Sequence, residues 1–261
     1  MIGTTCSAWS SSRRGEARRQ SGLEIVKVIA SLFPESVHTV TAPGDGQAPP
    51  LLPDEEPCMR RAVEKRRREF AAGRACARKA LEHFGIYDHP LLVGPDRAPV
   101  WPANIVGSIT HCKGFVGAAV AREGVIRGIG VDAERAHPLD RASVSLICSP
   151  QEREWIRVTA PPDYTDWPKL MFSAKEAAYK CLAPWCKRPL GFRDLEITLQ
   201  PAEGRFAIRF PGEAPFPHPD SVQLEGRFAT SATHVFTAVL LTACGIACRQ
   251  PNETQTPKVS P

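Results

Sequence analysis

The segment Gly128-Ile-Gly-Val-Asp-Ala-Glu134 constrains the fold most, because its strict alternation is typical of an extended strand. Alternation places the apolar residues 129, 131 and 133 on one face, and Gly130, Asp132 and Glu134 on the other. Two carboxylates about 5 Å apart repel by roughly 3 kcal/mol at an effective dielectric of about 20. A divalent cation would remove that cost, and oxygen ligands without nearby His or Cys suit Mg²⁺ or Mn²⁺. The alternative is a frayed strand end with both acids in water.

The remaining pattern predicts a helix followed by strands, twice over. Apolar periodicity indicates one or two amphipathic helices over 57–84, ending at Gly85, and further helices over 149–157 and 173–183. Strands are predicted over 105–121, 125–133, 195–199, 205–210, 222–230 and 234–242. A faint echo between the Ser108 and Ser231 segments accompanies this order. We therefore expect an α+β fold of two similar halves that meet near residue 125, with a shared ligand cleft.

The halves are expected to span residues 55–125 and 126–249. Residues 1–54 are predicted to be an extension that is partly disordered or loop-rich, and residues 250–261 a tail. No stretch approaches the roughly 18 apolar residues that span a bilayer, so no membrane span is expected. The nine cysteines include no CxxC pair, which favours a reduced, cytoplasmic protein and makes a zinc site improbable.

Positive charge is concentrated in one segment. Residues 60–79 carry nine Lys and Arg against Glu64 and Glu69, a local charge of +7 in a chain of net charge +5. This indicates an anionic ligand or partner at one place, although a solvated helix face explains it equally well. The arginines also permit a nucleic-acid-binding module, but the clustered acids argue against that alternative. A Mg²⁺-dependent nucleotidyl or phosphoryl transferase acting on a small molecule is a third possibility.

Two further segments carry residues with chemical potential. In Phe172-Ser-Ala-Lys-Glu-Ala-Ala-Tyr-Lys180, Ser173 and Glu176 have the spacing of a capping box, while Glu176 and Lys180 lie one turn apart. That spacing describes a well-made helix, or an acid for a metal beside a base for a phosphate. In Gly107-Ser-Ile-Thr-His-Cys112, His111 faces away from its neighbours in a strand. His111 and Cys112 therefore cannot form a nucleophile and base pair.

These segments, in this order, resemble the 4′-phosphopantetheinyl transferases of the Sfp/EntD type. The resemblance covers about residues 55–241, and it rests on five stretches: Lys65-Arg-Arg-Arg-Glu-Phe-Ala-Ala-Gly-Arg74-Ala-Cys-Ala-Arg78, Pro99-Val-Trp-Pro102, Gly107-Ser-Ile-Thr-His111, Gly130-Val-Asp-Ala-Glu134 and Phe172-Ser-Ala-Lys-Glu-Ala-Ala-Tyr-Lys180. It implies two pseudo-symmetric α+β halves with the active site in the cleft between them. It also implies transfer of phosphopantetheine from coenzyme A to a serine of an apo acyl or peptidyl carrier protein, releasing adenosine 3′,5′-bisphosphate. The carrier would belong to polyketide, nonribosomal-peptide, siderophore or lipid synthesis.

The resemblance also implies roles for individual residues. Mg²⁺, with Mn²⁺ as the alternative, would be held by Asp132, Glu134 and Glu176. Glu176 and Lys180 would be catalytic, with either Glu176 or a metal-bound water as the base that deprotonates the serine. Coenzyme A would contact Arg66, Arg74, Gly94, Thr110, His111, Asp132, Lys175, Glu176 and Lys180. A monomer with no nucleic-acid partner and no membrane span is expected.

Overall fold

The computed structural model describes residues 28–243, except 45, 47–48, 96, 162–165, 187 and 215–221. Within them no helix is long and apolar enough to cross a membrane. The elements, with η for 3-10 helices, are β1 (His38–Ala42), η1 (Glu56–Met59), α2 (Glu64–Glu82), β2 (Ile105–Cys112), β3 (Phe115–Arg122), β4 (Ile126–Arg135), α3 (Arg141–Ile147), α4 (Pro150–Val158), α5 (Trp167–Leu182), η2 (Ala183–Trp185), η3 (Phe192–Asp194), β5 (Glu196–Gln200), η4 (Pro201–Glu203), β6 (Arg205–Arg209), β7 (Val222–Thr230) and β8 (His234–Ala243). Residues 1–27 of the expected extension and the tail at 250–261 lie outside the described residues.

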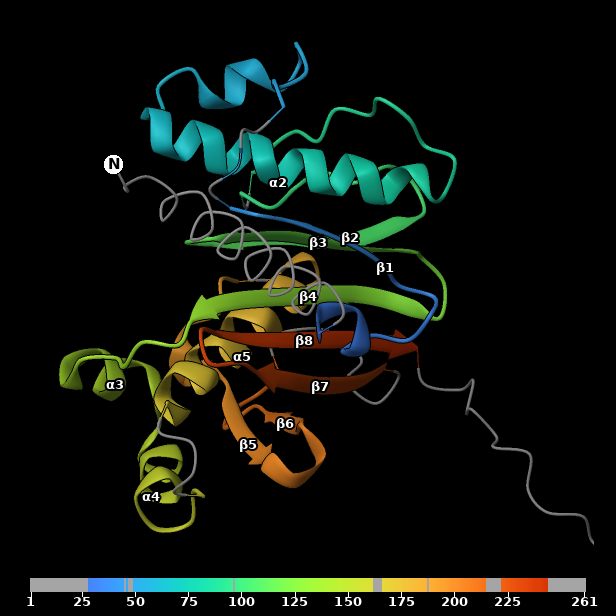
Figure 1. Cartoon of the computed structure of the whole chain (residues 1–261). Coiled ribbons are helices and arrows are strands. Elements are labelled where there is room, and N and C mark those ends of the chain that lie inside the picture. Colours follow the sequence, from blue (N-terminus) through green and yellow to red (C-terminus); the bar gives the residue numbers. More distant parts are fainter. Residues whose placement is uncertain are drawn as a thin grey trace, which may run out of the picture.

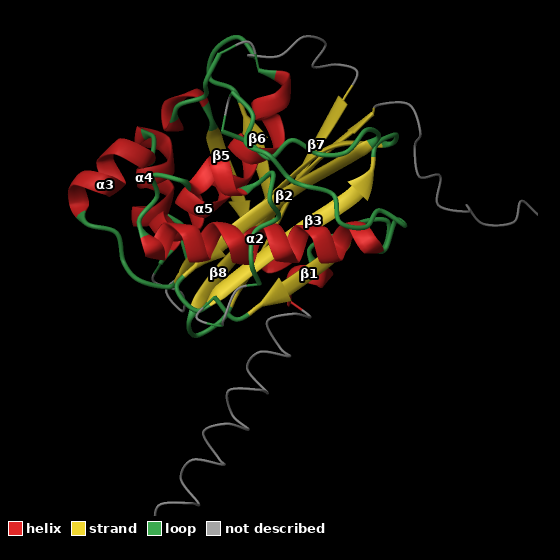
Figure 2. Cartoon of the chain, turned by 90° about the horizontal axis from the view of Figure 1, so that it is seen from above, coloured by secondary structure: helices red, strands yellow, loops and turns green. Residues whose placement is uncertain are grey.

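Two antiparallel sheets, each covered by a long helix, build the molecule. The first sheet has the strand order β1-β3-β2 and the second the order β4-β8-β7-β6-β5. Helix α2 lies across the first sheet, and α5 packs against the second (Figures 1 and 2). The prediction of an α+β fold is confirmed. The sheets differ in size, so the symmetry between the two halves is approximate.

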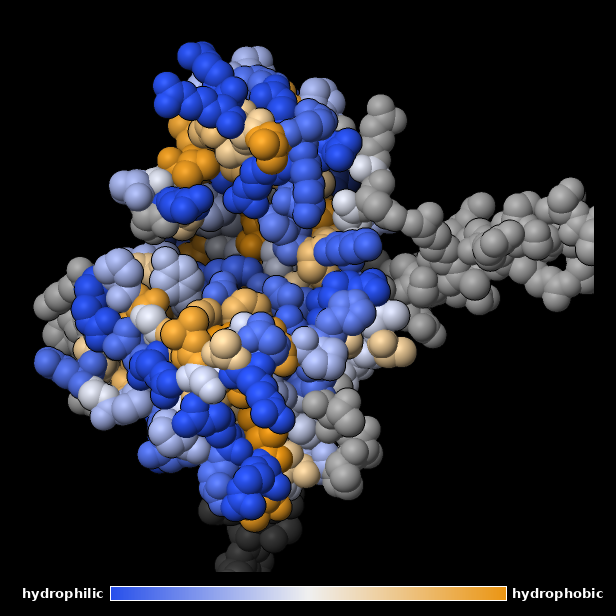
Figure 3. Space-filling view, turned by 90° about the vertical axis from the view of Figure 1, so that its left-hand side faces the viewer, coloured by the Kyte–Doolittle hydropathy of each residue, from blue (hydrophilic) through white to orange (hydrophobic). Residues whose placement is uncertain are grey.

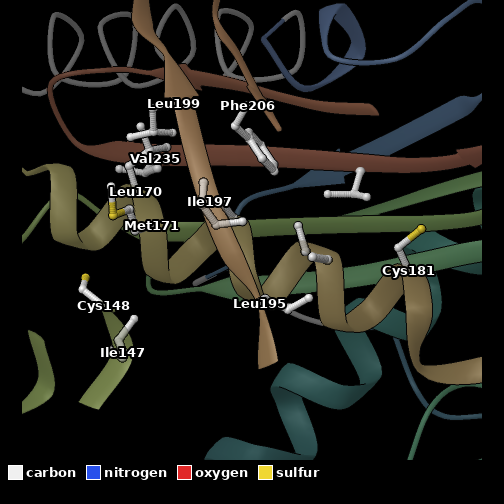
Figure 4. Close-up of a cluster of buried hydrophobic side chains, with 14 of the residues drawn as sticks. Ile147, Cys148, Leu170, Met171, Cys181, Leu195, Ile197, Leu199, Phe206 and Val235 are labelled. Atoms are coloured by element: carbon white, nitrogen blue, oxygen red, sulfur yellow. The ribbon is translucent and has the colours of Figure 1, made fainter. Parts of the chain in front are cut away.

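Alternating apolar residues place β3 between two layers of core. Val116, Ala118 and Val120 pack toward α2, whereas Phe115 and Ala119 belong to the cluster shared with β4 and β8. A third cluster joins the inner face of α5 to β5, β6 and β8, and Figure 4 draws 14 of its residues, ten of them labelled. Burial of these apolar side chains supplies the main favourable free energy of folding. Both helices are therefore fixed against their sheets by continuous apolar contact.

Side-chain hydroxyls join the two sheets at β2 and β4, the strands at their facing edges. The backbone N–H of Val131 donates to Ser108 Oγ at 3.1 Å, and that of Ala133 donates to Thr110 Oγ1 at 3.0 Å. Alternation puts both hydroxyls on one face of β2. These bonds satisfy edge N–H groups of β4 that would otherwise be buried without an acceptor.

The structure differs from the sequence-based expectation in four places. Residues 38–42, assigned to the extension, form β1 and pair with β3. Helix α3 was not predicted, although Asp140 caps it by accepting from the N–H of Ser143. Helix α5 begins at Trp167, so Ser173 lies inside the helix and does not cap it. The echoed serines are not equivalent, because Ser108 lies within β2 and Ser231 lies between β7 and β8.

A pair of stacked histidines should make stability depend on pH. The rings of His38 on β1 and His83 after α2 stack with centroids 4.2 Å apart. Burial lowers the pKa of His38 below its ordinary value, and the neighbouring His83 lowers it further. The unfolded chain therefore binds this proton more readily, and the free energy of unfolding should fall as pH drops below about 6.5. Urea denaturation at about pH 7.5 and about pH 5.5 should show a smaller fall for His38→Gln than for the unmodified chain. Equal falls in the two proteins would contradict this assignment.

Candidate active site

Helix α5 packs unusually close to β4 because β4 has glycine where the two backbones meet. A Cβ at Gly130 would lie 1.8 Å from the carbonyl oxygen of Ala177, and one at Gly128 would lie 2.8 Å from that of Cys181. Two residues advance a strand by about 6.6 Å, and four residues advance a helix by about 6 Å. Because β4 and α5 run in opposite directions, every second residue of β4 therefore meets every fourth residue of α5. The next two contacts in this series bring Asp132 and Glu134 opposite the preceding turns of α5.

Asp132 is the point on which β2, β4 and α5 converge. Its side chain is 6% exposed. The ammonium of Lys180 lies 2.6 Å from Oδ1, and Ser173 Oγ donates to Oδ2 at 2.9 Å. The hydroxyl of Thr110 approaches Oδ1 at 3.4 Å from the other half of the molecule. Helical side chains lean toward the N-terminus of their helix, which is how Lys180 reaches back to Asp132.

Two further carboxylates share the electrostatic environment of Asp132. Burial raises the pKa of Glu134 and that of Glu176, and the charge of Asp132 raises both further. Lys169 lies 3.7 Å from Glu134 Oε2 and partly offsets this effect. Lys180 does the same for Glu176. The three acids predicted to act together are therefore close enough to repel one another.

A metal ion would fit the chemistry of these donors but not their present arrangement. Among the residues that the structure describes, no three His, Cys, Asp or Glu side chains gather closely enough to hold a metal ion. Lys180 also supplies the positive charge beside Asp132. Hard divalent cations prefer carboxylate oxygens, and Asp132, Glu134 and Glu176 offer only such oxygens. Metal binding would require the Lys180 ammonium to move away from Asp132.

His111 lies on the α2 side of β2, opposite Thr110, as strand alternation predicts. Arg66 Nη1 lies 2.9 Å from His111 Nε2, and Glu69 lies 4.0 Å from the same nitrogen. Because a guanidinium only donates, Nε2 must accept and the proton of a neutral His111 is assigned to Nδ1. Cys112 lies on the side of the acids, where burial, Glu134 and Asp132 raise its pKa to about 12. The expectation that His111 does not activate Cys112 is confirmed.

Arg74 is held in the first half near the loop that contains Gly94. Its guanidinium carbon lies 4.1 Å above the ring of Phe70, and its Nε donates to the carbonyl of Leu91 at 2.8 Å. Burial lowers the pKa of Arg74 to about 10, although Glu55 partly offsets this. Gly94 itself begins a tight turn, in which its N–H donates to the carbonyl of Ala98. Arg74 therefore bonds the backbone three residues before Gly94 and holds the start of this loop against α2.

Lys175, which was predicted to contact coenzyme A, has an ammonium group enclosed by partners from its own chain. Its side chain is 1% exposed. The three N–H donors of the ammonium reach the carbonyls of Ile147 and Phe192 and the carboxylate of Glu152, at 2.8 to 2.9 Å. With every donor occupied inside the protein, Lys175 has none left for a phosphate.

Sequence reasoning missed Lys169 and a pocket beside Glu176. Lys169 lies seven residues before Glu176, two helical turns away on the same face, so periodicity could have identified it. The pocket has a volume of about 250 Å³, and its lining residues are Lys175, Glu176, Tyr179, Leu190, Gly191, Phe192 and Leu195. Its second wall comes from a segment with no sequence motif.

Figure 3 shows the face of the molecule toward which β4 runs. On this face a hollow separates an upper and a lower part, and the rims of both parts are largely hydrophilic.

Comparison with known proteins gives matches over most of the described chain. Residues 54–121 match the model of the 4′-phosphopantetheinyl transferase N-terminal domain, and residues 128–238 match that of the 4′-phosphopantetheinyl transferase superfamily. The chain is 39% identical over 222 residues to 4′-phosphopantetheinyl transferase Svp of Streptomyces mobaraensis, covering 83% of this chain and 90% of the relative. It is 37% identical over 223 residues to 4′-phosphopantetheinyl transferase PptT of Mycobacterium tuberculosis, covering 82% and 98%. It is 35% identical over 143 residues to enterobactin synthase component D of Salmonella typhi, covering 54% and 58%.

Proposed function

Since the chain belongs to the 4′-phosphopantetheinyl transferase family, we propose that the residues around Asp132 carry out its reaction. The enzyme transfers 4′-phosphopantetheine from coenzyme A to a serine hydroxyl of an apo carrier protein. The serine oxygen forms a bond to phosphorus, the pyrophosphate P–O bond breaks, and adenosine 3′,5′-bisphosphate leaves. The observation that carries the residue assignment is the convergence of Lys180 and Ser173 from α5 on Asp132 of β4.

The carboxylates and Lys180 have complementary roles in this proposal. Mg²⁺ would be held by Asp132, Glu134 and Glu176, where it would neutralise the diphosphate and stabilise charge on the leaving group. Glu176 also borders the pocket, and burial raises its pKa, which strengthens it as a base for the serine proton. Lys180, 27% exposed at its side chain, can turn from Asp132 to a phosphate oxygen.

The remaining parts of coenzyme A have candidate places on both sides of these residues. Arg66 and His111 would bind phosphate on the α2 side, with Arg74 supporting the Gly94 loop. The pocket beside Glu176 would take the pantetheine arm, because Leu190, Phe192 and Leu195 give it apolar walls next to the acid.

Charge pairing on α2 weakens the case for a nucleic-acid-binding module. Five of the nine basic residues of the 60–79 segment have carboxylate partners within 4.0 Å. They are Lys65, Arg67, Arg68, Arg78 and Lys79. These charges are partly compensated within the protein, so α2 presents less positive potential to a phosphate backbone than its sequence suggests.

Carrier modification tests the proposed function directly. The purified chain is incubated with coenzyme A, Mg²⁺ and apo carriers from polyketide, nonribosomal-peptide, siderophore and fatty-acid systems. Intact-mass measurement should show one phosphopantetheine added to at least one carrier, with an equal amount of adenosine 3′,5′-bisphosphate. Failure on all of these carriers would overturn the proposal. Replacing Mg²⁺ with Mn²⁺ or with chelator tests the metal requirement in the same assay.

We also propose that the enzyme works as a monomer in a reducing compartment such as the cytoplasm. The cysteines at 58, 76, 112, 148, 181 and 186 are free thiols. Structural disulfides would be expected in an oxidising compartment.

Removing Lys180 should strengthen binding of a metal alone while impairing use of coenzyme A. In Lys180→Met the ammonium no longer competes for Asp132. Mn²⁺ should then bind about tenfold more tightly in the absence of coenzyme A, because a positive charge about 5 Å from the ion costs a few kcal/mol before screening. The KM for coenzyme A should rise. Electron paramagnetic resonance of free Mn²⁺ measures the first effect.

Lys79→Met is the matched control, since it removes an exposed lysine paired with Glu82 on α2. Its affinity for Mn²⁺ should stay near that of the unmodified chain. Weaker Mn²⁺ binding by Lys180→Met would show that the ammonium does not compete with the metal.

A further inference from the structure

The second half contains a buried ion pair that the proposed chemistry does not use. Lys175 on α5 and Glu152 on α4 lie 2.8 Å apart, with side chains 1% and 2% exposed. Burying two charges costs desolvation free energy, and well-packed apolar residues of similar size often stabilise a protein as much. Stability alone therefore does not account for this pair. Its other contacts indicate what it fixes.

The pair ties α5 to four separate backbone segments. Lys175 donates to the carbonyl of Ile147 at the end of α3 and to that of Phe192 in η3. Glu152 accepts from the N–H of Ile197 on β5 at 2.7 Å and from that of Ser149 before α4 at 2.6 Å. Every donor of the ammonium and both oxygens of the carboxylate have partners. The arrangement therefore tolerates little displacement of any of these segments.

The contact with Phe192 connects the ion pair to the pocket. One wall of the pocket is α5 with Lys175, Glu176 and Tyr179, and the other is the 190–195 segment with Phe192. Lys175 donates to the Phe192 carbonyl at 2.9 Å, so it bonds the second wall to the first. The ring of Phe192 also lies 5.7 Å from that of Phe172 on α5. The width of the pocket beside Glu176 is thus set by a polar contact from the residue before it.

We propose that Lys175 and Glu152 form a positioning pair that fixes the 190–195 wall at the width the pantetheine arm requires. The inference rests on the proposed function, in which this pocket receives the arm. Lys175 then acts on binding of the arm by holding Phe192, since its ammonium has no donor left for a polar group of coenzyme A. Transfer requires the arm to be held so that its phosphate is correctly placed relative to the serine oxygen and Glu176.

The test compares a ligand that has the arm with one that lacks it. Calorimetric titration of the full chain measures the Kd of coenzyme A and of adenosine 3′,5′-bisphosphate. In Lys175→Met/Glu152→Leu, which removes both charges, the Kd of coenzyme A should rise about tenfold or more, since a misfit of one methylene costs that much in an apolar pocket. The Kd of adenosine 3′,5′-bisphosphate should change less than about twofold. KM for coenzyme A should rise more than kcat falls.

Glu152→Gln provides a milder variant if the double variant does not fold. It keeps the shape of the side chain and removes the charge that orients Lys175, so a smaller change with the same selectivity is expected. A double-mutant cycle with Phe192→Ala on the Kd of coenzyme A should be non-additive, because both changes act on one wall. Arg157→Gln, which breaks an exposed pair with Glu154 on α4, is the matched control and should leave both Kd values unchanged.

Equal weakening of both ligands, or a lower melting temperature with neither Kd changed, would overturn the positioning role. The unmodified chain separates this outcome from failure of the proposed function. If it modifies carriers but binds the two ligands equally tightly, the arm does not use the pocket and the inference fails alone. If it modifies none of the tested carriers, the proposed function and the inference fail together.

Discussion

Replacing Asp132 with alanine should lower kcat for phosphopantetheine transfer by about a thousandfold or more, the largest effect of any single substitution. Loss of one charge-stabilising group from a transition state costs on the order of 10² to 10³ in rate, and Asp132 also organises three neighbours. Without it, Lys180 and Ser173 lose the carboxylate that both of them contact. The hydroxyl of Thr110 on β2 also loses its acceptor at Asp132 Oδ1. Rates of carrier modification at saturating coenzyme A measure the effect.

The Asp132→Ala experiment needs comparison variants that also lose one negative charge, and it needs a check that each variant folds. Asp132→Asn keeps the shape of the side chain and should lose nearly as much activity, because the charge is what Lys180 and a metal ion recognise. Glu225→Gln removes a carboxylate from β7, two strands away from β4, where it pairs with Arg227 and Arg205, and it should keep full activity. Thermal unfolding should remain cooperative in all three. A rate within tenfold of the unmodified enzyme for Asp132→Ala would refute the site assignment.

Adding one methyl group in Gly130→Ala should both destabilise the protein and remove most of its activity. The new Cβ would lie 1.8 Å from the Ala177 carbonyl oxygen, so α5 and β4 must separate. Overpacking of this kind costs about 1 to 3 kcal/mol and occasionally more. Separation also moves Glu176 and Lys180 relative to Asp132, and a misplacement of about 1 Å can cost about a hundredfold in rate. Urea denaturation and carrier modification measure the two effects.

The obstruction at Gly130 comes from backbone, which gives the experiment a sharp control. Ala177→Gly should not rescue Gly130→Ala, because it leaves the carbonyl oxygen in place. Gly124→Ala should be nearly neutral, since a Cβ there meets nothing within 4 Å. Recovery of activity in the Gly130→Ala/Ala177→Gly variant would show that the close approach of the two backbones is not what limits this position.

Strand periodicity predicted much of the fold because local pattern and burial agree there. The alternation of residues 128–134 places Ile129, Val131 and Ala133 in one apolar cluster and Asp132 toward α5. Helix boundaries were less predictable. Ser173 and Glu176 have the spacing of a capping box, but a helix that starts at Trp167 overrides this local signal. The hydroxyl of Ser173 is then free to bond Asp132, which no local rule anticipates.

The assignment of Lys175 illustrates why a motif does not determine the role of each of its residues. Adjacent residues on a helix point about 100° apart, so Lys175 cannot share the face of Glu176 and Lys180. Its partner Glu152 lies 23 residues earlier in the chain, where the spacing of Ser149 and Glu152 indicates a capping box and nothing more. The pocket wall at 190–195 is likewise assembled by tertiary contacts. Sequence therefore singled out the acids of the proposed site, while the environment of Lys175 required the structure.

The two halves are joined at β2 and β4 by side-chain hydroxyls and not by a row of backbone hydrogen bonds. Breaking the contacts of Ser108 and Thr110 to β4 would cost about 1 kcal/mol each, whereas sliding within either sheet would rupture a whole row of backbone bonds. A shear of one half past the other would also disturb the apolar cluster that β3 shares with β4 and β8, so the joint between the halves resists sliding through packing more than through hydrogen bonds. Because the Thr110 hydroxyl bonds the Ala133 N–H and approaches Asp132 Oδ1, such a shear would alter the surroundings of that carboxylate directly.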